Sequence, residues 1–192
     1  MSSDSVQQII DYLWPEGDSM TGPQVYAVLD GARDRRIEPM VRLSRLEHAC
    51  LYAGRLSPRM QAAAPYVVHL APDARFTREL LETGWGENWG FFTIVPVDVT
   101  LERHRRHFRK LLRVKDESGR ILMFRFYDPR VLRVYLPTCT GDEARQFFGP
   151  VPRMVAEAED GGSLLTYTPK ATGINAQSHP FESISSPEPV ER

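Results

Sequence analysis

The apolar residues of this 192-residue chain come in short runs, and the longest include Val25–Leu29 and Phe91–Val97. Runs of this length fit buried strands, whereas a helix that crosses a bilayer needs roughly 20 apolar residues. Hydrophobic residues make up 42% of the chain, which is enough for a core at this length. Because strand-like and helix-like patterns are mixed along the chain, we expect an α/β or α+β fold with no membrane insertion. Its centre would be a mixed β-sheet flanked by helices.

Turn residues separate the patterned segments and set their expected limits. Strands are predicted at residues 24–32, 65–71, 91–95, 121–128, 154–159 and 163–168. The main helices are predicted at residues 5–14, 74–84 and 101–114, with shorter ones beginning near Pro39, Asp128 and Asp142. Side chains suited to N-capping precede four of these helices, namely Asp73, Thr100, Asp128 and Asp142.

The apolar pattern ends after Pro169, and the last residues are rich in Ser, Pro and Glu. Such a segment cannot bury enough apolar surface to offset the entropy lost on ordering. We therefore expect one folded domain over residues 1–168 and a disordered tail over residues 169–192.

Two features predict a cytoplasmic protein. The first residues, Met-Ser-Ser-Asp-Ser, have neither the basic nor the apolar region of a secretory signal. The chain has only two cysteines, Cys50 and Cys139, which do not make a disulfide framework.

Charge is segregated along the chain although the net charge is only −1. Residues 1–30 carry five acids and no Lys or Arg, whereas residues 101–135 carry eleven basic residues against four acids. The predicted helix over residues 101–115 has a basic polar side formed by Arg103, Arg105, Arg106, Arg109, Lys110, Arg113 and Lys115. A solvated amphipathic face is the simplest interpretation, and binding to an acidic protein surface is the second. Nucleic-acid binding comes third, because the pI is about 6.5 and no nucleic-acid motif is present.

The sequence gives only weak support for a metal-binding or catalytic site. His104 and His107 share a helix face, but the Arg and Lys residues around them repel a divalent cation. Neither Cys50 nor Cys139 lies in a nucleophile or redox motif. A partly buried structural thiol is the favoured interpretation of Cys139, and a pKa lowered by a nearby helix start is the alternative. We expect no enzymatic activity, no metal and no cofactor; a hydrolase would need Cys139, a histidine and a carboxylate in one cleft.

The segment Gly84–Gly90, GWGENWG, superficially resembles a phosphate-binding loop. It precedes an apolar strand, lacks the following Lys-Ser/Thr, and has tryptophans where small residues are needed, so we exclude a nucleotide site. Core packing of Trp85 and Trp89 is the favoured interpretation, and exposure of one of them as an interface anchor is the alternative.

Several ordered motifs together point to a family. They are YAVLDGA from Tyr26, LYAG from Leu51, APYVVHL from Ala64, GWGENWGFF from Gly84, and the long segment from Leu101 to Val151 that contains FRFYDPRVL and FFGPV. In this order they closely resemble the family called domain of unknown function 4123, over about residues 24–151.

The resemblance implies a function. Members of that family act as adaptor chaperones of the bacterial type VI secretion system, holding a toxic effector and loading it onto the spike protein of the apparatus. It implies a protein that works by binding alone, with a cognate effector and the spike protein as partners and no nucleic acid. A nucleic-acid-binding regulator that uses the basic helix is the alternative.

We expect the partner surface to combine the basic helix with the tryptophan loop, since Arg and Trp are enriched at binding hot spots. Arg130 is included because it would pair with Asp30 or with a partner carboxylate. The expected partner-binding residues are Trp85, Trp89, Arg105, Arg106, Arg109 and Arg130. An open alternative is that these motifs serve only to specify the fold.

Overall fold

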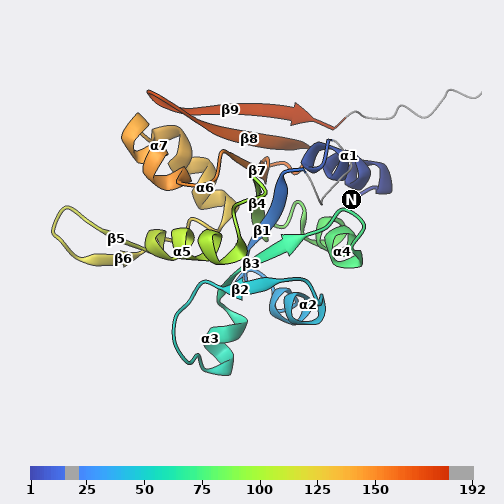
Figure 1. Ribbon diagram of the computed structural model, residues 1–192, viewed down its shortest axis with the longest axis horizontal. Helices are drawn as coiled ribbons and strands as arrows, with labels where there is room; N and C mark the ends of the chain where they lie inside the picture. Colours follow the sequence, from blue (N-terminus) through green and yellow to red (C-terminus); the bar gives the residue numbers. More distant parts are fainter. Residues whose placement is uncertain (16–21, 182–192) are drawn as a thin grey trace, which may run out of the picture.

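A seven-stranded sheet forms the centre of the protein (Figure 1). The computed structural model describes residues 1–15 and 22–181. In spatial order the strands are β2 (His48–Cys50), β3 (Pro65–Leu70), β1 (Gln24–Asp30), β4 (Gly90–Val95), β7 (Arg153–Glu157), β8 (Ser163–Lys170) and β9 (Gly173–Pro180). Every neighbouring pair is antiparallel, so the fold is α+β and the sheet is not mixed as expected. Apolar runs do not encode strand direction, because the path of the connections sets it.

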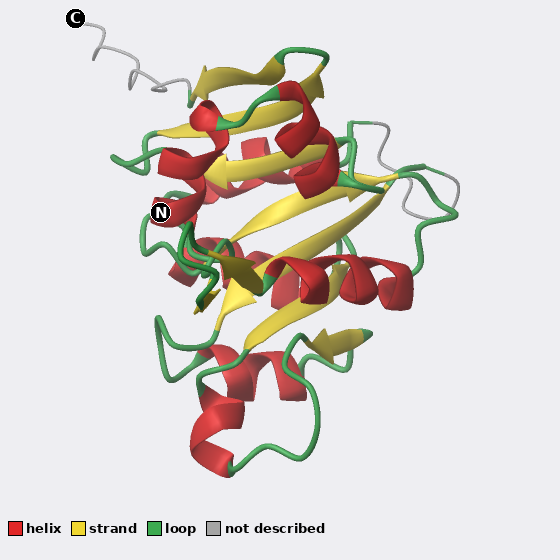
Figure 2. Cartoon of the chain, turned by 90° about the vertical axis from the view of Figure 1, so that its left-hand side faces the viewer, coloured by secondary structure: helices red, strands yellow, loops and turns green. Residues whose placement is uncertain are grey.

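Helices cover both faces of this sheet (Figure 2). One face carries α1 (Ser3–Leu13), α2 (Ile37–Leu43) and α4 (Arg75–Gly84), and the other carries α5 (Leu101–Leu111), α6 (Pro129–Tyr135) and α7 (Gly141–Phe148). The short α3 (Pro58–Ala62) has no buried residue. A turn of 3₁₀ helix, η1 (Leu136–Thr138), follows α6.

The pattern in β1 shows why its sequence is one continuous apolar run. Val25, Ala27 and Leu29 belong to the core under α1, α2 and α4. Tyr26 and Val28 belong to the second core, under α5, α6 and α7. Successive side chains of a strand point to opposite faces, so a strand covered on both sides needs apolar residues at every position.

Two helices begin at the N-cap residues that the sequence predicts. The Thr100 hydroxyl accepts the backbone N–H of Arg103, and the Asp128 carboxylate accepts that of Arg130. Asp142 is not the cap of α7; Thr140 caps it and forms a reciprocal capping box with Glu143.

Asp73 is not a cap either. The N-cap residue of α4 is Ala74, which has no side-chain acceptor.

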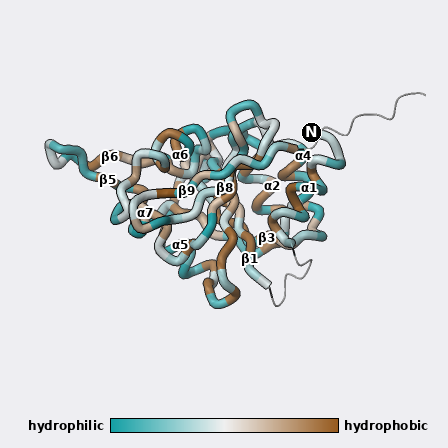
Figure 3. The backbone as a smooth tube through the Cα atoms, turned by 90° about the horizontal axis from the view of Figure 1, so that it is seen from above, coloured by the Kyte–Doolittle hydropathy of each residue, from teal (hydrophilic) through white to brown (hydrophobic). Residues whose placement is uncertain are grey.

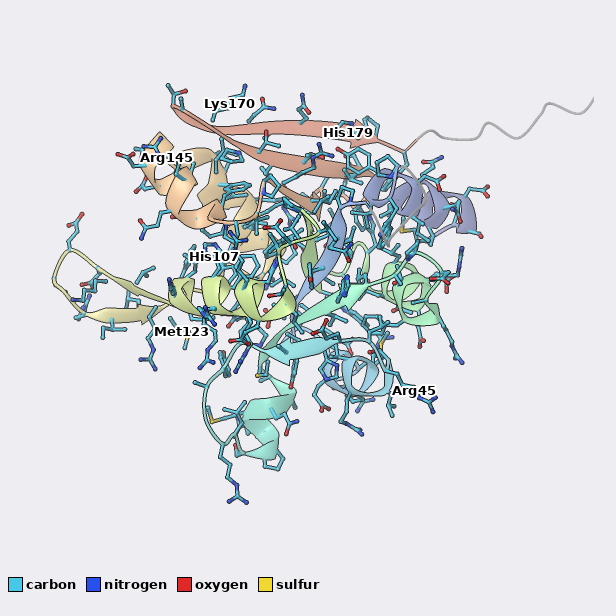
Figure 4. The ribbon with its side chains drawn as sticks, viewed as in Figure 1. Arg45, His107, Met123, Arg145, Lys170 and His179 are labelled. Atoms are coloured by element: carbon cyan, nitrogen blue, oxygen red, sulfur yellow. The ribbon has the colours of Figure 1, made fainter. Side chains whose placement is uncertain are left out.

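The expected tail over residues 169–192 is wrong for its first part, because residues 173–180 form β9. This strand pairs with β8 from Ser163 opposite Pro180 to Lys170 opposite Gly173, and Figure 4 labels Lys170 and His179 near the two ends of the hairpin. Strand pairing uses backbone groups, so the polar sequence of β9 gave no apolar signal. Residues 182–192 lie outside the described residues.

Candidate protein-binding surface

A two-stranded hairpin projects from the body of the protein beyond α5 (Figures 1 and 3). It consists of β5 (Arg113–Lys115) and β6 (Ile121–Met123), and we call residues 113–123 the hairpin arm. Four large apolar side chains of the arm are exposed: Val114 (40%), Ile121 (64%), Leu122 (46%) and Met123 (55%). They make up four of the nine exposed large hydrophobic residues in the described part of the chain, so exposed apolar surface is concentrated here.

The sequence predicts a strand over residues 121–128 but not this arrangement. Only Ile121–Met123 is a strand, and it pairs with β5 outside the main sheet. Phe126 and Tyr127 lie beyond it and are buried in the core.

A groove lies where the arm joins the body, along α6. Two adjoining hollows share Phe124 and Tyr135, whose rings meet edge to face with centroids 4.8 Å apart. One hollow, about 610 Å³, runs along Val131 and Val134 of α6, and the other, about 210 Å³, lies between β5 and α7. We call both together the α6 groove. Val134 is 73% exposed at its edge, so apolar surface continues from the arm onto α6.

The basic helix is α5, and its first half is neutralised by nearby carboxylates. Arg103 pairs with Asp98 at 3.2 Å, and Arg105 pairs with Glu102 at 3.0 Å. Arg105 is also half-buried and donates to the Cys50 carbonyl. The predicted site residue Arg106 is exposed and reaches the same Glu102 at 4.0 Å.

Towards the C-terminal end of α5 and in β5, the basic side chains have fewer acidic partners. Among the described residues no ion-pair partner lies within 4 Å of four consecutive basic side chains, Arg109, Lys110, Arg113 and Lys115. Arg113 and Lys110 also border the smaller hollow of the α6 groove. Uncompensated positive charge therefore lies beside the exposed apolar arm, at the C-terminal end of α5.

Trp85 and Trp89 are buried, at 9% and 3% exposure, so the expectation that they lie on a partner surface is corrected. They pack in the core under α1, α2 and α4, as the favoured interpretation has it. The carboxylate of Glu157 fixes their loop by accepting the backbone N–H groups of Gly86 and of Asn88, the latter at 2.6 Å. Burial raises the pKa of the Glu157 carboxyl, and the two backbone donors oppose that rise.

Arg130 does not pair with Asp30. It forms a salt bridge with Asp128, two residues earlier, at 2.6 Å, while Asp30 is bound by Arg125. The Arg130 side chain is half exposed and borders the larger hollow of the α6 groove.

The two histidines of α5 make contacts inside the protein. His104 is fully buried, with Nε2 3.0 Å from the Thr93 hydroxyl, and burial lowers its pKa to about 3. His107 Nε2 lies 2.7 Å from the Phe147 carbonyl oxygen and joins α5 to α7. Within residues 1–15 and 22–181, no group of three or more His, Cys, Asp or Glu side chains is placed to hold a metal ion.

Cys139 is a buried free thiol, as the favoured interpretation has it, and the alternative of a lowered pKa is wrong. Burial raises the pKa of its thiol, and its sulfur lies 3.6 Å from the Tyr135 carbonyl oxygen. A raised pKa keeps the thiol protonated and so opposes a nucleophilic role.

The model of the family described as "Domain of unknown function (DUF4123)" matches residues 25–146. The chain belongs to this family. No curated protein and no solved structure matches the chain. The DUF4123 match runs from β1 into α7, so the basic helix, the hairpin arm and the α6 groove except Phe147 lie inside the family region. Strands β7, β8 and β9 lie outside it, and no helix of the described residues is long and apolar enough to span a membrane.

Proposed function

We propose that this protein is a non-enzymatic adaptor chaperone of a bacterial type VI secretion system. It binds a cognate toxic effector in the cytoplasm and loads it onto the spike protein of the apparatus. Membership of the DUF4123 family supports this proposal, together with the resemblance of the ordered motifs to adaptors of that system. Binding alone accounts for such a role, so no catalytic group is required.

The observation that carries the proposal is the concentration of exposed apolar side chains on the hairpin arm and along the α6 groove. Soluble monomers rarely expose large contiguous apolar patches, and those that exist usually mark an interaction site. Ile121 and Val134 are among the most exposed large apolar side chains of the described chain, at 64% and 73%. We assign this surface to effector capture.

Basic side chains beside the patch fit the same role. Interfaces commonly combine an apolar centre with a polar rim, and opposite charge on the partner accelerates encounter. Arg109, Lys110, Arg113 and Lys115 would supply that rim, since none of them has an ion-pair partner among the described residues.

A pulldown from the native bacterium tests the proposal, with this protein as tagged bait and mass spectrometry of the copurifying proteins. The expected result is a large toxin-like protein, the spike protein, or both, under conditions that express the secretion system. Recovery of neither partner would contradict the proposal.

The uncompensated basic cluster favours a second candidate, a regulator that binds nucleic acid through α5. Phosphate contacts would make binding to nonspecific DNA fall steeply with salt concentration. The exposed apolar residues between the basic ones are not explained by it. Fluorescence anisotropy with labelled duplex DNA at several salt concentrations distinguishes the two functions, since an adaptor is expected to show no such binding at physiological salt.

A further inference from the structure

The outer edge of β5 has backbone groups that point away from the hairpin. The Phe124 N–H donates to the Leu112 carbonyl at 2.9 Å, and the Asp116 N–H donates to the Arg120 carbonyl at 3.0 Å. Hydrogen-bonded and non-bonded pairs alternate in an antiparallel ladder, so Val114 opposite Leu122 is the bonded pair between these two. Arg113 and Lys115 are then in non-bonded pairs, and their N–H and C=O groups face outward.

This edge is open. Sheet order shows only β5 and β6 in the second sheet of the described residues, with no further strand on either side. An isolated hairpin of two strands is marginally stable in water, and an uncovered edge is a template for pairing with another chain. A third strand would stabilise the arm and occupy its free backbone groups.

A hollow borders β5 on the side of α7. The smaller hollow of the α6 groove, about 210 Å³, is bordered by β5 on one side and by Glu143 and Gln146 of α7 on another. Phe124 and Tyr135 also line it. Side chains of an extended segment paired with β5 can therefore reach apolar contacts in this hollow.

Charge and polarity along this edge specify the segment. Arg113 and Lys115 lie on one face of the hairpin with Met123 and Ile121, while Val114 lies on the other. Lys110 adds a further positive charge at the hollow. Glu143, the acidic residue among those that line the hollow, accepts hydrogen bonds from the N–H and hydroxyl of Thr140 in the capping box.

We propose that β5 binds an extended segment of a partner protein as a third strand, through a sequence that alternates acidic and apolar residues. Two acidic side chains lie opposite Arg113 and Lys115, and the apolar residue between them lies beside Val114. Cross-strand pairs of opposite charge stabilise such a strand, and backbone hydrogen bonds supply affinity. The identification of that partner as the effector rests on the proposed function, whereas the strand addition does not.

The opposite edge fits a different and less specific partner. Strand β6 carries Ile121, Leu122 and Met123, so a strand added there would meet three apolar residues and no charge. Charge complementarity therefore assigns the acidic segment to β5.

The test uses two blocked twelve-residue peptides, one alternating Glu with Val and one alternating Lys with Val. Fluorescence anisotropy with the full chain is expected to show binding of the Glu peptide only, weakened about tenfold or more by R113E/K115E. The same variant is expected to gain binding of the Lys peptide. The control R55E/R59E reverses the charge of two exposed arginines, Arg55 before α3 and Arg59 within it. This variant is expected to bind the peptides as the wild type does.

Backbone hydrogen exchange locates the bound peptide. Slower exchange at Arg113 and Lys115 is expected, with no change at Ile121 and Met123. Protection of the β6 residues instead, equal binding of both peptides, or no binding at millimolar peptide would overturn the inference.

Capture of effector from the native bacterium separates this inference from the proposed function. Effector capture that survives R113E/K115E, together with failure of the Glu peptide to bind, leaves the adaptor function standing and removes the β5 site. Peptide binding at β5 without any effector in the wild-type pulldown leaves the strand addition standing and removes the adaptor function.

Discussion

The carboxylate of Asp30, at the end of β1, lies 2.5 Å from the guanidinium of Arg125, ninety-five residues later in the chain. Asp30 is fully buried, whereas the Arg125 side chain is 44% exposed. The second carboxylate oxygen accepts the N–H of Ala32 at 3.0 Å. The pair therefore joins the end of the central strand to the segment that leads from the hairpin arm into α6.

Removal of Arg125 is expected to destabilise the fold. R125A leaves the buried Asp30 carboxylate without its charged partner, and we expect a loss of about 2 kcal/mol in the free energy of unfolding. R120A is the matched control, because Arg120 pairs with Asp116 on the surface of the arm and its loss should cost under about 1 kcal/mol. Urea denaturation measures both, and equal losses would contradict the buried role of the Asp30–Arg125 pair.

Stability is expected to fall as the pH drops below neutrality, because His104 is buried in its neutral form. Its pKa is about 3 in the folded protein, against an ordinary value of 6.5 for histidine. Between these values the unfolded chain binds the proton and the folded protein does not, so stability present above pH 6.5 is lost progressively towards pH 3. From pH 7 to pH 5 the loss is about 2 kcal/mol.

Burial also lowers the pKa of His69 and of His107, which adds to the same trend. H104Q isolates the contribution of His104, and its unfolding free energy should depend less steeply on pH than that of the wild type. An unchanged slope between pH 7 and pH 5 would assign the effect to other groups.

Glu157 is expected to control the environment of Trp85 and Trp89. In E157Q the side-chain amide turns a donor towards one of the two backbone N–H groups that the carboxylate now accepts. We expect a loss of about 1 to 3 kcal/mol and a red shift of the tryptophan fluorescence as the loop loosens. E159Q is the control, since Glu159 is exposed beyond the end of β7. A fluorescence spectrum of E157Q identical to that of the wild type would argue against this role.

A single methyl group at Gly141 is expected to disturb the contact of α7 with the β8–β9 turn. A Cβ built there would lie 1.8 Å from the carbonyl oxygen of Ala171, so G141A must displace the backbone of the turn. We expect a lower Tm for G141A and little change for G162A, where the nearest atoms lie at 3.5 Å. Similar Tm values for the two variants would show that the turn is not packed on α7.

Effector capture is expected to depend on the α6 groove if the adaptor function holds. V134D places a charge on the apolar edge of the groove and should abolish copurification of the effector. V97D is the matched control, because Val97 is also exposed, at 60%, but belongs to the loop after β4. Both variants should keep the wild-type Tm, and capture by V134D at the wild-type level would remove the groove from the binding surface.

The sequence predicts those parts of the fold that depend on neighbouring residues. Thr100 and Asp128 mark helix starts because a cap acts within three residues, and the buried strand of Val25–Leu29 is visible as an apolar run. Strand direction and the pairing of β9 depend on distant backbone groups, so the pattern does not show them. The family is likewise predicted correctly from its ordered motifs.

The residues expected at the partner surface differ in where the structure places them. Arg130 borders the α6 groove and Arg106 is exposed on α5, but Trp85 and Trp89 are in the core. Composition could not separate these cases, because a tryptophan suits both a core and an interface. In the sequence, Ile121, Leu122 and Met123 begin the strand expected over residues 121–128, and only the position of the arm reveals that nothing in the described chain covers them.

The place of β7 in the sheet has a consequence for synthesis of the protein on the ribosome. Strand β7 pairs with the edge of β4, where Phe92 lies opposite Val155, yet about sixty residues of chain separate the two. As the polypeptide emerges, β4 is exposed at the edge of the growing sheet until β7 has left the exit tunnel. A nascent chain stalled at the end of the family region would therefore present a bare apolar strand to chaperones and to other nascent chains.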